Sequence, residues 1–168
     1  MDNKFLQKSL ENFAKQVIKQ SRSNLTRKDK NVTKELYNSL DYDIKISPNS
    51  FQLSLNMDIY GQFQDKGVSG KDKKYDTPYS YKNKRPPTKP LIKWIKDRGI
   101  RFRNKKGRFI KDTAAGFILS NSIFHKGIKP SLFFTKAFEN SFERLPEDII
   151  ELYSLEIDKF LKASVNNI

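Results

Sequence analysis

Residues 42–57, with the sequence YDIKISPNSFQLSLNM, decide the expected fold because apolar and polar side chains alternate along them. A period of two is typical of a strand with one buried face, and residues 47–50 between the two runs are of the types found in turns. We therefore predict a β-hairpin with one apolar face. The apolar positions are Tyr42, Ile44, Ile46, Phe51, Leu53, Leu55 and Met57.

Helical spacing replaces this alternation on both sides of the hairpin. The predicted helices are an N-terminal helix ended by the polar stretch 21–30, a short helix at about 32–40, helices at about 88–98 and 113–126, and two more after Pro130 and Pro146. In the helix at 113–126, the residues expected to face inward are Ala115, Ile118, Leu119 and Ser122. The pattern predicts an α+β fold, in which N-terminal and C-terminal helices pack on a small antiparallel β-sheet within a single domain, residues 1–168.

The positive charge is concentrated in one third of the chain. The 168 residues include 33 Lys and Arg against 19 Asp and Glu, a net charge of +14. Residues 61–112 carry 17 basic and 5 acidic side chains, a net charge of +12. This asymmetry favours a region that faces a polyanion or an acidic partner. A solvated, lysine-rich loop would also explain the composition, so both interpretations stay open.

Much of this charge lies in residues 68–127, for which we expect a loop, a helix, a β-hairpin and a helix. We expect residues 59–90 to be one long loop. In the hairpin, a loop at residues 104–107 would place Phe102 opposite Phe109 and Arg103 opposite Arg108.

Opposed like charges destabilise a sheet, so a face of paired arginines favours a phosphate or carboxylate partner, although two solvated arginines are the alternative. The candidate contacts with a nucleic acid or an acidic partner are Lys82, Lys84, Arg85, Arg101, Arg103, Lys105, Lys106 and Arg108.

The composition argues against enzymatic chemistry. The absence of Cys excludes disulfides, thiolate zinc sites and Cys nucleophiles, and the single histidine, His125, cannot form a His pair for a metal. The chain has neither a Walker loop nor a GxSxG motif. Asp43 and Lys45 alone would suggest a nuclease, but no second acid accompanies them. We expect no enzyme, no cofactor and, without a long apolar run, no membrane association.

Three further segments occur in a characteristic order. Residues 31–40, NVTKELYNSL, are similar to a T-G-x-L-x-x-S-I element, although Lys34 replaces the glycine. Residues 60–67, YGQFQDKG, are similar to a Y-A-x-Y-x-E-x-G element, with Asp65 at the acidic position. Residues 130–138, PSLFFTKAF, are similar to a closing P-F-(L/F)-x-x-A element. This succession resembles the tail-completion, or head–tail joining (neck), proteins of tailed bacteriophages, over roughly residues 1–67 and 128–165. The resemblance implies that residues 68–127 are a basic insertion between elements that lie closer together in that family.

The resemblance implies a non-enzymatic virion protein with an α+β fold that assembles as a ring at the head–tail interface. The implied partners are other copies of the chain, other phage neck, portal or tail proteins, and genome DNA passing through the lumen. The implied location is the virion, with the host cytoplasm as the site of assembly. The candidate subunit-interface residues are Tyr60, Gly61, Phe63, Asp65 and Gly67. A place in the core is the alternative for the two aromatic residues.

A free nucleic-acid-binding protein is the alternative function. In that case the basic and aromatic segment 66–111 would supply phosphate contacts, and Tyr75, Tyr79 and Tyr81 would stack on bases.

Overall fold

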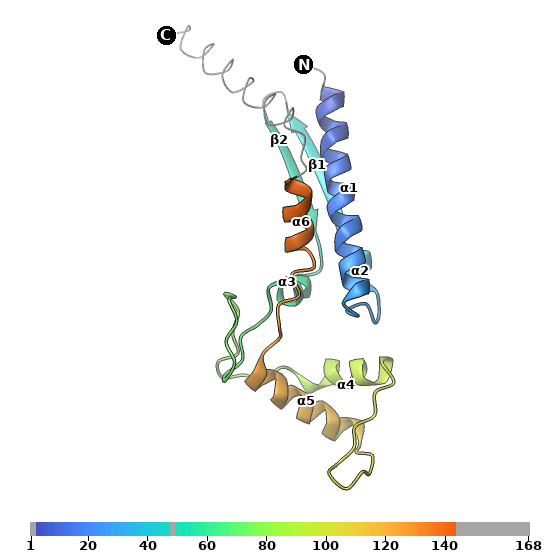
Figure 1. The fold of residues 1–168 in the computed structure, drawn as a ribbon, viewed down its shortest axis with the longest axis vertical. Helices are drawn as coiled ribbons and strands as arrows, with labels where there is room; N and C mark the ends of the chain where they lie inside the picture. Colours follow the sequence, from blue (N-terminus) through green and yellow to red (C-terminus); the bar gives the residue numbers. More distant parts are fainter. Residues whose placement is uncertain (1–2, 48–49, 144–168) are drawn as a thin grey trace.

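The computed structural model describes residues 3–47 and 50–143 of the chain, and the helix predicted after Pro146 lies outside these residues. The described residues form the predicted α+β fold, with one two-stranded antiparallel sheet that packs on the first helix. Figure 1 shows an elongated molecule in which α1, α6 and the sheet form one part and α4 and α5 form another. The elements are α1 (Asn3–Arg27), α2 (Glu35–Ser39), β1 (Asp41–Ser47), β2 (Ser50–Asn56), α3 (Ile59–Lys66), α4 (Thr88–Asp97), α5 (Asp112–Lys126) and α6 (Thr135–Phe142).

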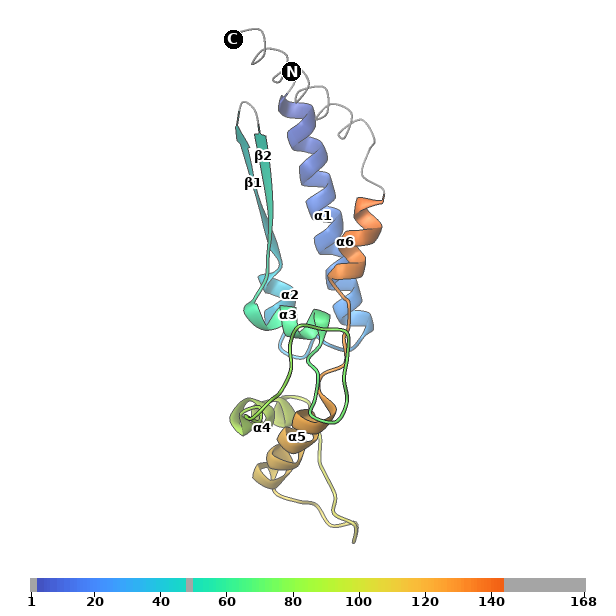
Figure 2. The same ribbon diagram turned by 90° about the vertical axis from the view of Figure 1, so that its left-hand side faces the viewer.

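The structure confirms the β-hairpin that the alternating side chains predict. Ile44 on β1 pairs with Leu53 on β2 in an antiparallel register. Every second residue of β1 is half-buried and the residues between them are exposed. Figure 2 shows the hairpin along one side of α1 and α6 along another, so α1 is the central element of this part of the molecule.

Helix α1 is longer than the sequence predicts, because it continues through the polar stretch to Arg27. Ser21 and Leu25 are completely buried. Arg22 donates hydrogen bonds to the backbone oxygens of Tyr37 at 3.0 Å and Leu40 at 3.1 Å. These bonds give Arg22 partners in α2 and at Leu40, which follows it, so the predicted helix end at residue 21 was wrong.

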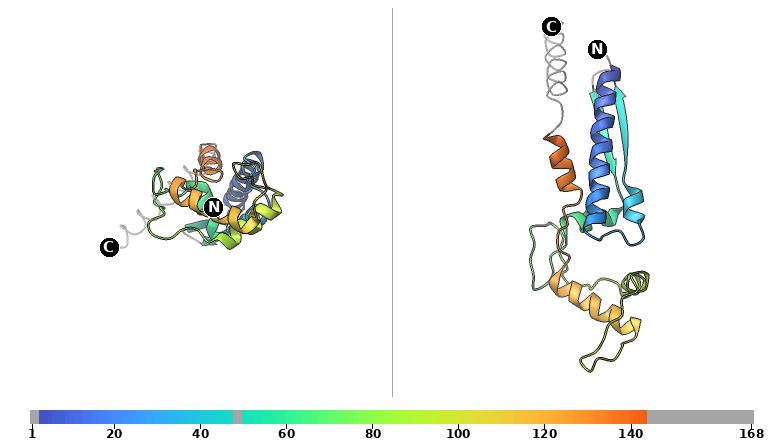
Figure 3. Two further views of the ribbon diagram at one scale, coloured as in Figure 1. Left: turned by 90° about the horizontal axis from the view of Figure 1, so that it is seen from below. Right: turned by 45° about the vertical axis from the view of Figure 1, so that its right-hand side comes forward.

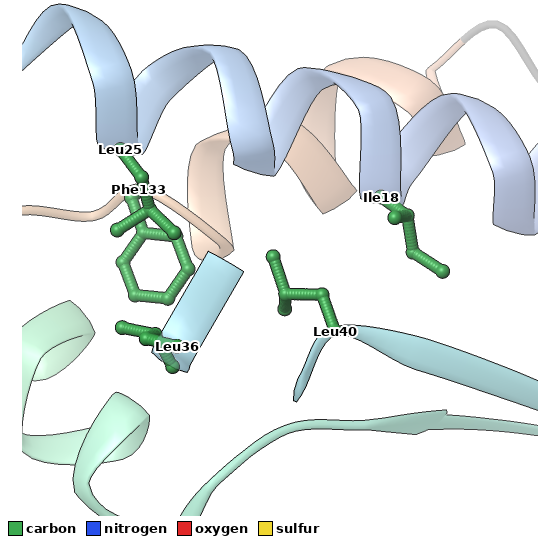
Figure 4. Packing of buried hydrophobic residues seen from close by; sticks show 5 residues of the cluster. All are labelled: Ile18, Leu25, Leu36, Leu40 and Phe133. Carbon is green, nitrogen blue, oxygen red and sulfur yellow. The ribbon is translucent and has the colours of Figure 1, made fainter. Parts of the chain in front are cut away.

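The buried core joins segments that are distant in the sequence. It consists of Ile18 and Leu25 from α1, Leu36 from α2, Leu40, and Phe133, which precedes α6. Figure 4 shows Leu25, Leu36 and Phe133 pointing toward one another. Both termini of the described chain therefore contribute to one core.

Residues 59–66 form α3 and not the predicted loop. Gly61 is buried in this helix. A Cβ there would overlap neighbouring side chains, since it would lie 2.7 Å from Met57 Sδ and 2.8 Å from Leu36 Cδ1. Gly61 thus serves the close packing of α3 on α2.

Helices α4 and α5 occupy nearly the predicted residues and pack on each other. The buried face of α5 consists of Ala115, Gly116, Ser120 and Phe124. Ala115 is inward as predicted, but Ile118 is 52% exposed, so its predicted inward orientation was wrong. Small residues allow α4 to approach closely, since a Cβ on Gly116 would overlap Ile92.

The two ends of the segment 68–127 lie side by side. Val68 and Ile128 form an antiparallel bridge with backbone hydrogen bonds of 2.9 and 2.8 Å. Arg98, directly after α4, donates to the carboxylate and backbone oxygen of Asp29, which follows α1. Figure 3 (right) shows α4 and α5 beyond the end of α1 where α2 lies. The insertion is thus anchored at its base, and the pair of Arg98 and Asp29 is one of its lateral contacts.

Candidate polyanion-binding and subunit-contact surfaces

The predicted pairing of residues 100–110 is wrong by one position. Arg103 pairs with Phe109, and Asn104 N donates to Arg108 O at 2.9 Å, so the two arginines are not opposed. Asn104 sets this register because its Oδ1 accepts hydrogen bonds of 3.0 Å from both Lys106 N and Arg108 N. An asparagine side chain that binds the backbone two residues later closes a turn of its own, which the pairing prediction did not include.

We call residues 101–110 the basic finger. Figures 1 and 2 show it extending away from α4 and α5. Its five basic side chains are all exposed, and no ion pair involving them occurs among the residues that the structure describes. They are Arg101, Arg103, Lys105, Lys106 and Arg108. The structure thus places five of the eight predicted cationic contacts on one short projection.

The other three predicted contacts lie elsewhere. Lys82, Lys84 and Arg85 are exposed in the segment that leads into α4. The Arg85 guanidinium lies over the rings of Phe117 and Phe124, 5.5 and 5.9 Å from their centroids. This places Arg85 beside the later turns of α5, whereas the basic finger directly precedes its first turn.

Three of the five predicted interface residues are buried by contacts within the chain. Asp65 is 3% exposed and accepts hydrogen bonds from Phe134 N at 2.8 Å and from the backbone and hydroxyl of Thr135. Gly67 has a φ of +74°, and a Cβ there would lie 2.7 Å from Pro130 N. Asp65 and Gly67 contact the segment that leads into α6, Gly61 packs on α2, and a contact of any of the three with another subunit stays a prediction.

Tyr60 and Phe63 contribute to an open groove of about 590 Å³ between α3 and the loop that follows it. The Phe63 ring lies 4.7 Å from that of Tyr79, whose hydroxyl donates to Gln62 Oε1. We call this surface the aromatic groove and define it by Tyr60, Phe63, Pro78, Tyr79, Tyr81 and Ile128. The sequence did not predict that Pro78, Tyr79, Tyr81 and Ile128 belong to the same surface as Tyr60 and Phe63. These residues become neighbours only when the loop folds onto α3.

Burial raises the pKa of the Tyr60 phenol above its usual value, and the nearby carboxylates of Glu35 and Asp58 raise it further. Burial alone raises the pKa of Tyr81. Both phenols therefore stay neutral at physiological pH, as suits an aromatic contact surface with polar rims.

Large apolar side chains are exposed at several other places. Ile59, at the start of α3, is 80% exposed. Phe117 and Ile118 on α5 are 57% and 52% exposed, and Phe142 on α6 is 53% exposed. Phe117 and Ile118 are adjacent on α5, whereas Ile59 and Phe142 lie on other helices.

The residues considered for catalysis are not assembled into a site. Asp43 and Lys45 lie on the exposed face of β1, where Asp43 pairs with Ser54. His125 Nδ1 lies 2.9 Å from Asp72 Oδ2 at the end of α5. Within residues 3–47 and 50–143, no group of three His, Asp or Glu side chains is placed to hold a metal ion. The described helices include none with the length and apolar character needed to cross a membrane.

No protein-family model, curated protein or solved structure matches the chain.

Proposed function

We propose that this chain is a non-enzymatic structural protein of a phage virion, a ring-forming tail-completion subunit that joins the portal side of the head to the tail. One observation carries the proposal. The three segments that resemble the tail-completion proteins, at residues 31–40, 60–67 and 130–138, meet in one continuous unit of the fold.

The contacts within this unit involve the residues that carry the resemblance. Leu36 from the first segment packs against Gly61 of the second and shares the core with Phe133 of the third. Asp65, at the acidic position of the second segment, binds the backbone of Phe134 in the third. A chance likeness of three short segments gives no reason for such convergence, whereas a shared structural framework does.

The insertion is compatible with this framework. Its ends are adjacent, since Val68 pairs with Ile128, so the framework is continuous without residues 68–127. An added segment of this kind is tolerated when its ends meet at the surface of the original fold.

Ring assembly would cover surfaces that the single chain leaves exposed. The aromatic groove and Phe142 lie on different elements, as a head-to-tail contact between neighbouring subunits requires. Among the described residues, β1 and β2 pair only with each other, so a strand of a neighbouring subunit would find a sheet edge at which to pair. In such a ring the basic segment would face lumen DNA or an acidic neighbouring protein.

The function is tested by the mass of the assembly. The full chain, analysed by size-exclusion chromatography with light scattering and by native mass spectrometry, should form a ring with a defined number of subunits. The variant Tyr60→Asp, which places a charge in the aromatic groove, should dissociate the ring, whereas Asp43→Ala on the exposed hairpin face should leave it intact.

A chain that stays monomeric at all concentrations and binds short DNA with submicromolar affinity would contradict the connector and support the free nucleic-acid-binding alternative. Magnesium-dependent DNA cleavage that is lost in Asp43→Ala would contradict both of these functions.

A further inference from the structure

We propose that the basic finger binds the phosphodiester backbone of double-stranded DNA without reading its sequence, and that Phe109 is the positioning residue that holds two of its arginines. The inference rests on the proposed function, in which duplex DNA passes the subunit ring. It adds the class of ligand, the part of the chain that binds it and a residue on which the binding geometry depends.

The charge of the basic finger is the first argument. Five cations occur within residues 101–110, and this stretch contains no acidic residue. All five side chains are exposed, and the described part of the chain supplies no carboxylate to pair with them. Their mutual repulsion is relieved by a partner with closely spaced negative charges, and duplex DNA carries one charge per about 1.7 Å of its axis.

The geometry of two arginines is the second argument. The Arg103 guanidinium lies 4.0 Å and that of Arg101 5.6 Å from the centroid of the Phe109 ring. Arg103 also donates to Gly107 O at 3.0 Å, which uses one of its five N–H groups and leaves the others for a ligand. An arginine that is already held on an aromatic ring loses less side-chain freedom on binding, and its planar fork matches a phosphate.

The turn of the finger is built to present the two lysines. Asn104 Oδ1 accepts from the backbone of Lys106 and Arg108, and Gly107 has a φ of +77°. The side-chain bonds of Asn104 and the left-handed glycine fix this turn with Lys105 and Lys106 at its tip. A fixed turn at the end of a projection can approach a DNA backbone without obstruction by the rest of the chain (Figure 2).

The tyrosines favour a duplex over a single strand. Binding of single strands relies on aromatic side chains that stack on bases. Tyr79 instead packs on Phe63 and binds Gln62 through its hydroxyl, and the Tyr81 ring lies 6.4 Å from that of Phe124. The finger contains two aromatic rings, of which Phe102 is half-buried and Phe109 already lies under two guanidinium groups. Its chemistry therefore suits phosphates and not bases.

The test is a salt-titrated binding curve for the full chain and a mixed-sequence duplex of about 30 base pairs, a length that exceeds the site of a single finger. The variant Lys105→Gln with Lys106→Gln should weaken binding about tenfold and reduce the slope of log K against log salt by about 2, because two phosphate contacts are lost. The matched control, Lys82→Gln with Lys84→Gln, removes the same charge elsewhere and should weaken binding about twofold through screened, long-range attraction only.

Phe109 is tested without any change of charge. Phe109→Leu should weaken binding about threefold, because Arg101 and Arg103 lose their aromatic support, and Phe109→Tyr should restore it. Circular dichroism and the elution volume of each variant provide the control for the fold. A purely structural role of residue 109 would alter those readouts together with binding.

Three results would overturn the inference. Equal effects of the two lysine pairs would show diffuse attraction and not a site. Wild-type binding by Phe109→Leu would remove the positioning role. Poly-glutamate that displaces the duplex at equal charge concentration would show an acidic protein as the partner. A ring that assembles but fails to bind DNA contradicts this inference alone, whereas finger-dependent DNA binding by a chain that never assembles contradicts the proposed function.

Discussion

Asp65 on α3 caps helix α6 through Thr135, a residue 70 positions away in the sequence. Its carboxylate accepts hydrogen bonds from the backbone N–H groups of Phe134 and Thr135 and from the Thr135 hydroxyl. A negative charge at the first turn of a helix satisfies its unpaired donors and interacts favourably with the helix dipole. One side chain therefore joins the two segments between which residues 68–127 are inserted.

Loss of this cap should destabilise the fold. Asp65→Ala leaves buried N–H groups without acceptors and should lower the free energy of unfolding by about 2–3 kcal/mol, whereas Asp65→Asn, which keeps one acceptor oxygen, should cost about 1 kcal/mol. Urea denaturation followed by circular dichroism measures both. Asp58→Ala is the matched control, because Asp58 is exposed and its side chain makes no capping bond to α3. An equal effect at both positions would contradict the cap.

Two glycines in left-handed conformations should respond differently to the same substitution. Gly67, with a φ of +74°, faces the backbone of Ile128 and Pro130, whereas Gly99, with a φ of +64°, has no atom within 4 Å of its Cβ position. Gly99→Ala should cost about 1 kcal/mol from backbone strain alone. Gly67→Ala should cost about 3 kcal/mol, because steric overlap adds to the strain. Similar thermal shifts of the two variants would exclude close contact at Gly67.

A buried hydroxyl offers a stabilising substitution. Ser21 is completely buried on α1, and its Oγ has no hydrogen-bond partner. Ser21→Ala removes this unsatisfied group and improves helix propensity, so the free energy of unfolding should rise by about 1 kcal/mol. Ser23→Ala, on the exposed side of the same helix, should gain only the propensity contribution of a few tenths of a kcal/mol. A loss of stability in Ser21→Ala would mean that the hydroxyl has a partner after all.

The contact between Arg98 and Asp29 should restrain the insertion. Arg98→Met removes the bonds to the carboxylate and backbone oxygen of Asp29, while its thioether still covers Trp94. We expect faster hydrogen exchange in α4 with little change in α1, and a loss of about 1 kcal/mol at most, because the Asp29 side chain is largely exposed. Lys93→Met, which removes the exposed 4.0 Å pair with Glu35, is the control and should change neither. Unchanged exchange in Arg98→Met would contradict the restraint.

The raised pKa of Tyr60 predicts a dependence on alkaline pH. Burial and the carboxylates of Glu35 and Asp58 raise the pKa of this phenol in the folded state above 10.0, the value of an unfolded tyrosine. Between these two pKa values the unfolded chain binds fewer protons, so the stabilising contribution is complete below pH 10 and is lost as the pH rises through the folded pKa. Tyr60→Phe should reduce this decline in stability, followed together with tyrosinate absorbance. An identical pH profile in Tyr60→Phe would contradict the shift.

The sequence predicted those features that depend on local periodicity. The hairpin at 42–57 and the positions of α4 and α5 follow from apolar spacing along a single segment, because that spacing alone determines which face each element can bury. The charge count likewise located the basic region, since charge is additive along the chain. The interface role of Tyr60, the polyanion contacts and the ring itself stay predictions.

Tertiary contacts decided the features on which the sequence prediction was wrong. Helix α1 continues past residue 21, where Tyr37 and Leu40 supply acceptors for Arg22, and α3 replaces the start of the predicted loop at 59–90, where Gly61 packs closely on Leu36. The register of the basic finger depends on the side chain of Asn104, which competes with strand pairing. Each of these outcomes depends on a partner that periodicity does not describe.

By itself, the sequence determined the α+β class, the hairpin and the place of the positive charge, because these are properties of residue types at short spacing. Only the tertiary structure decided that Asp65 caps α6, that Val68 meets Ile128, and that Arg103 pairs with Phe109 and not with Arg108. The physical reason is that hydrogen bonds and close packing act between atoms in space, and these partners become neighbours only when the chain has folded.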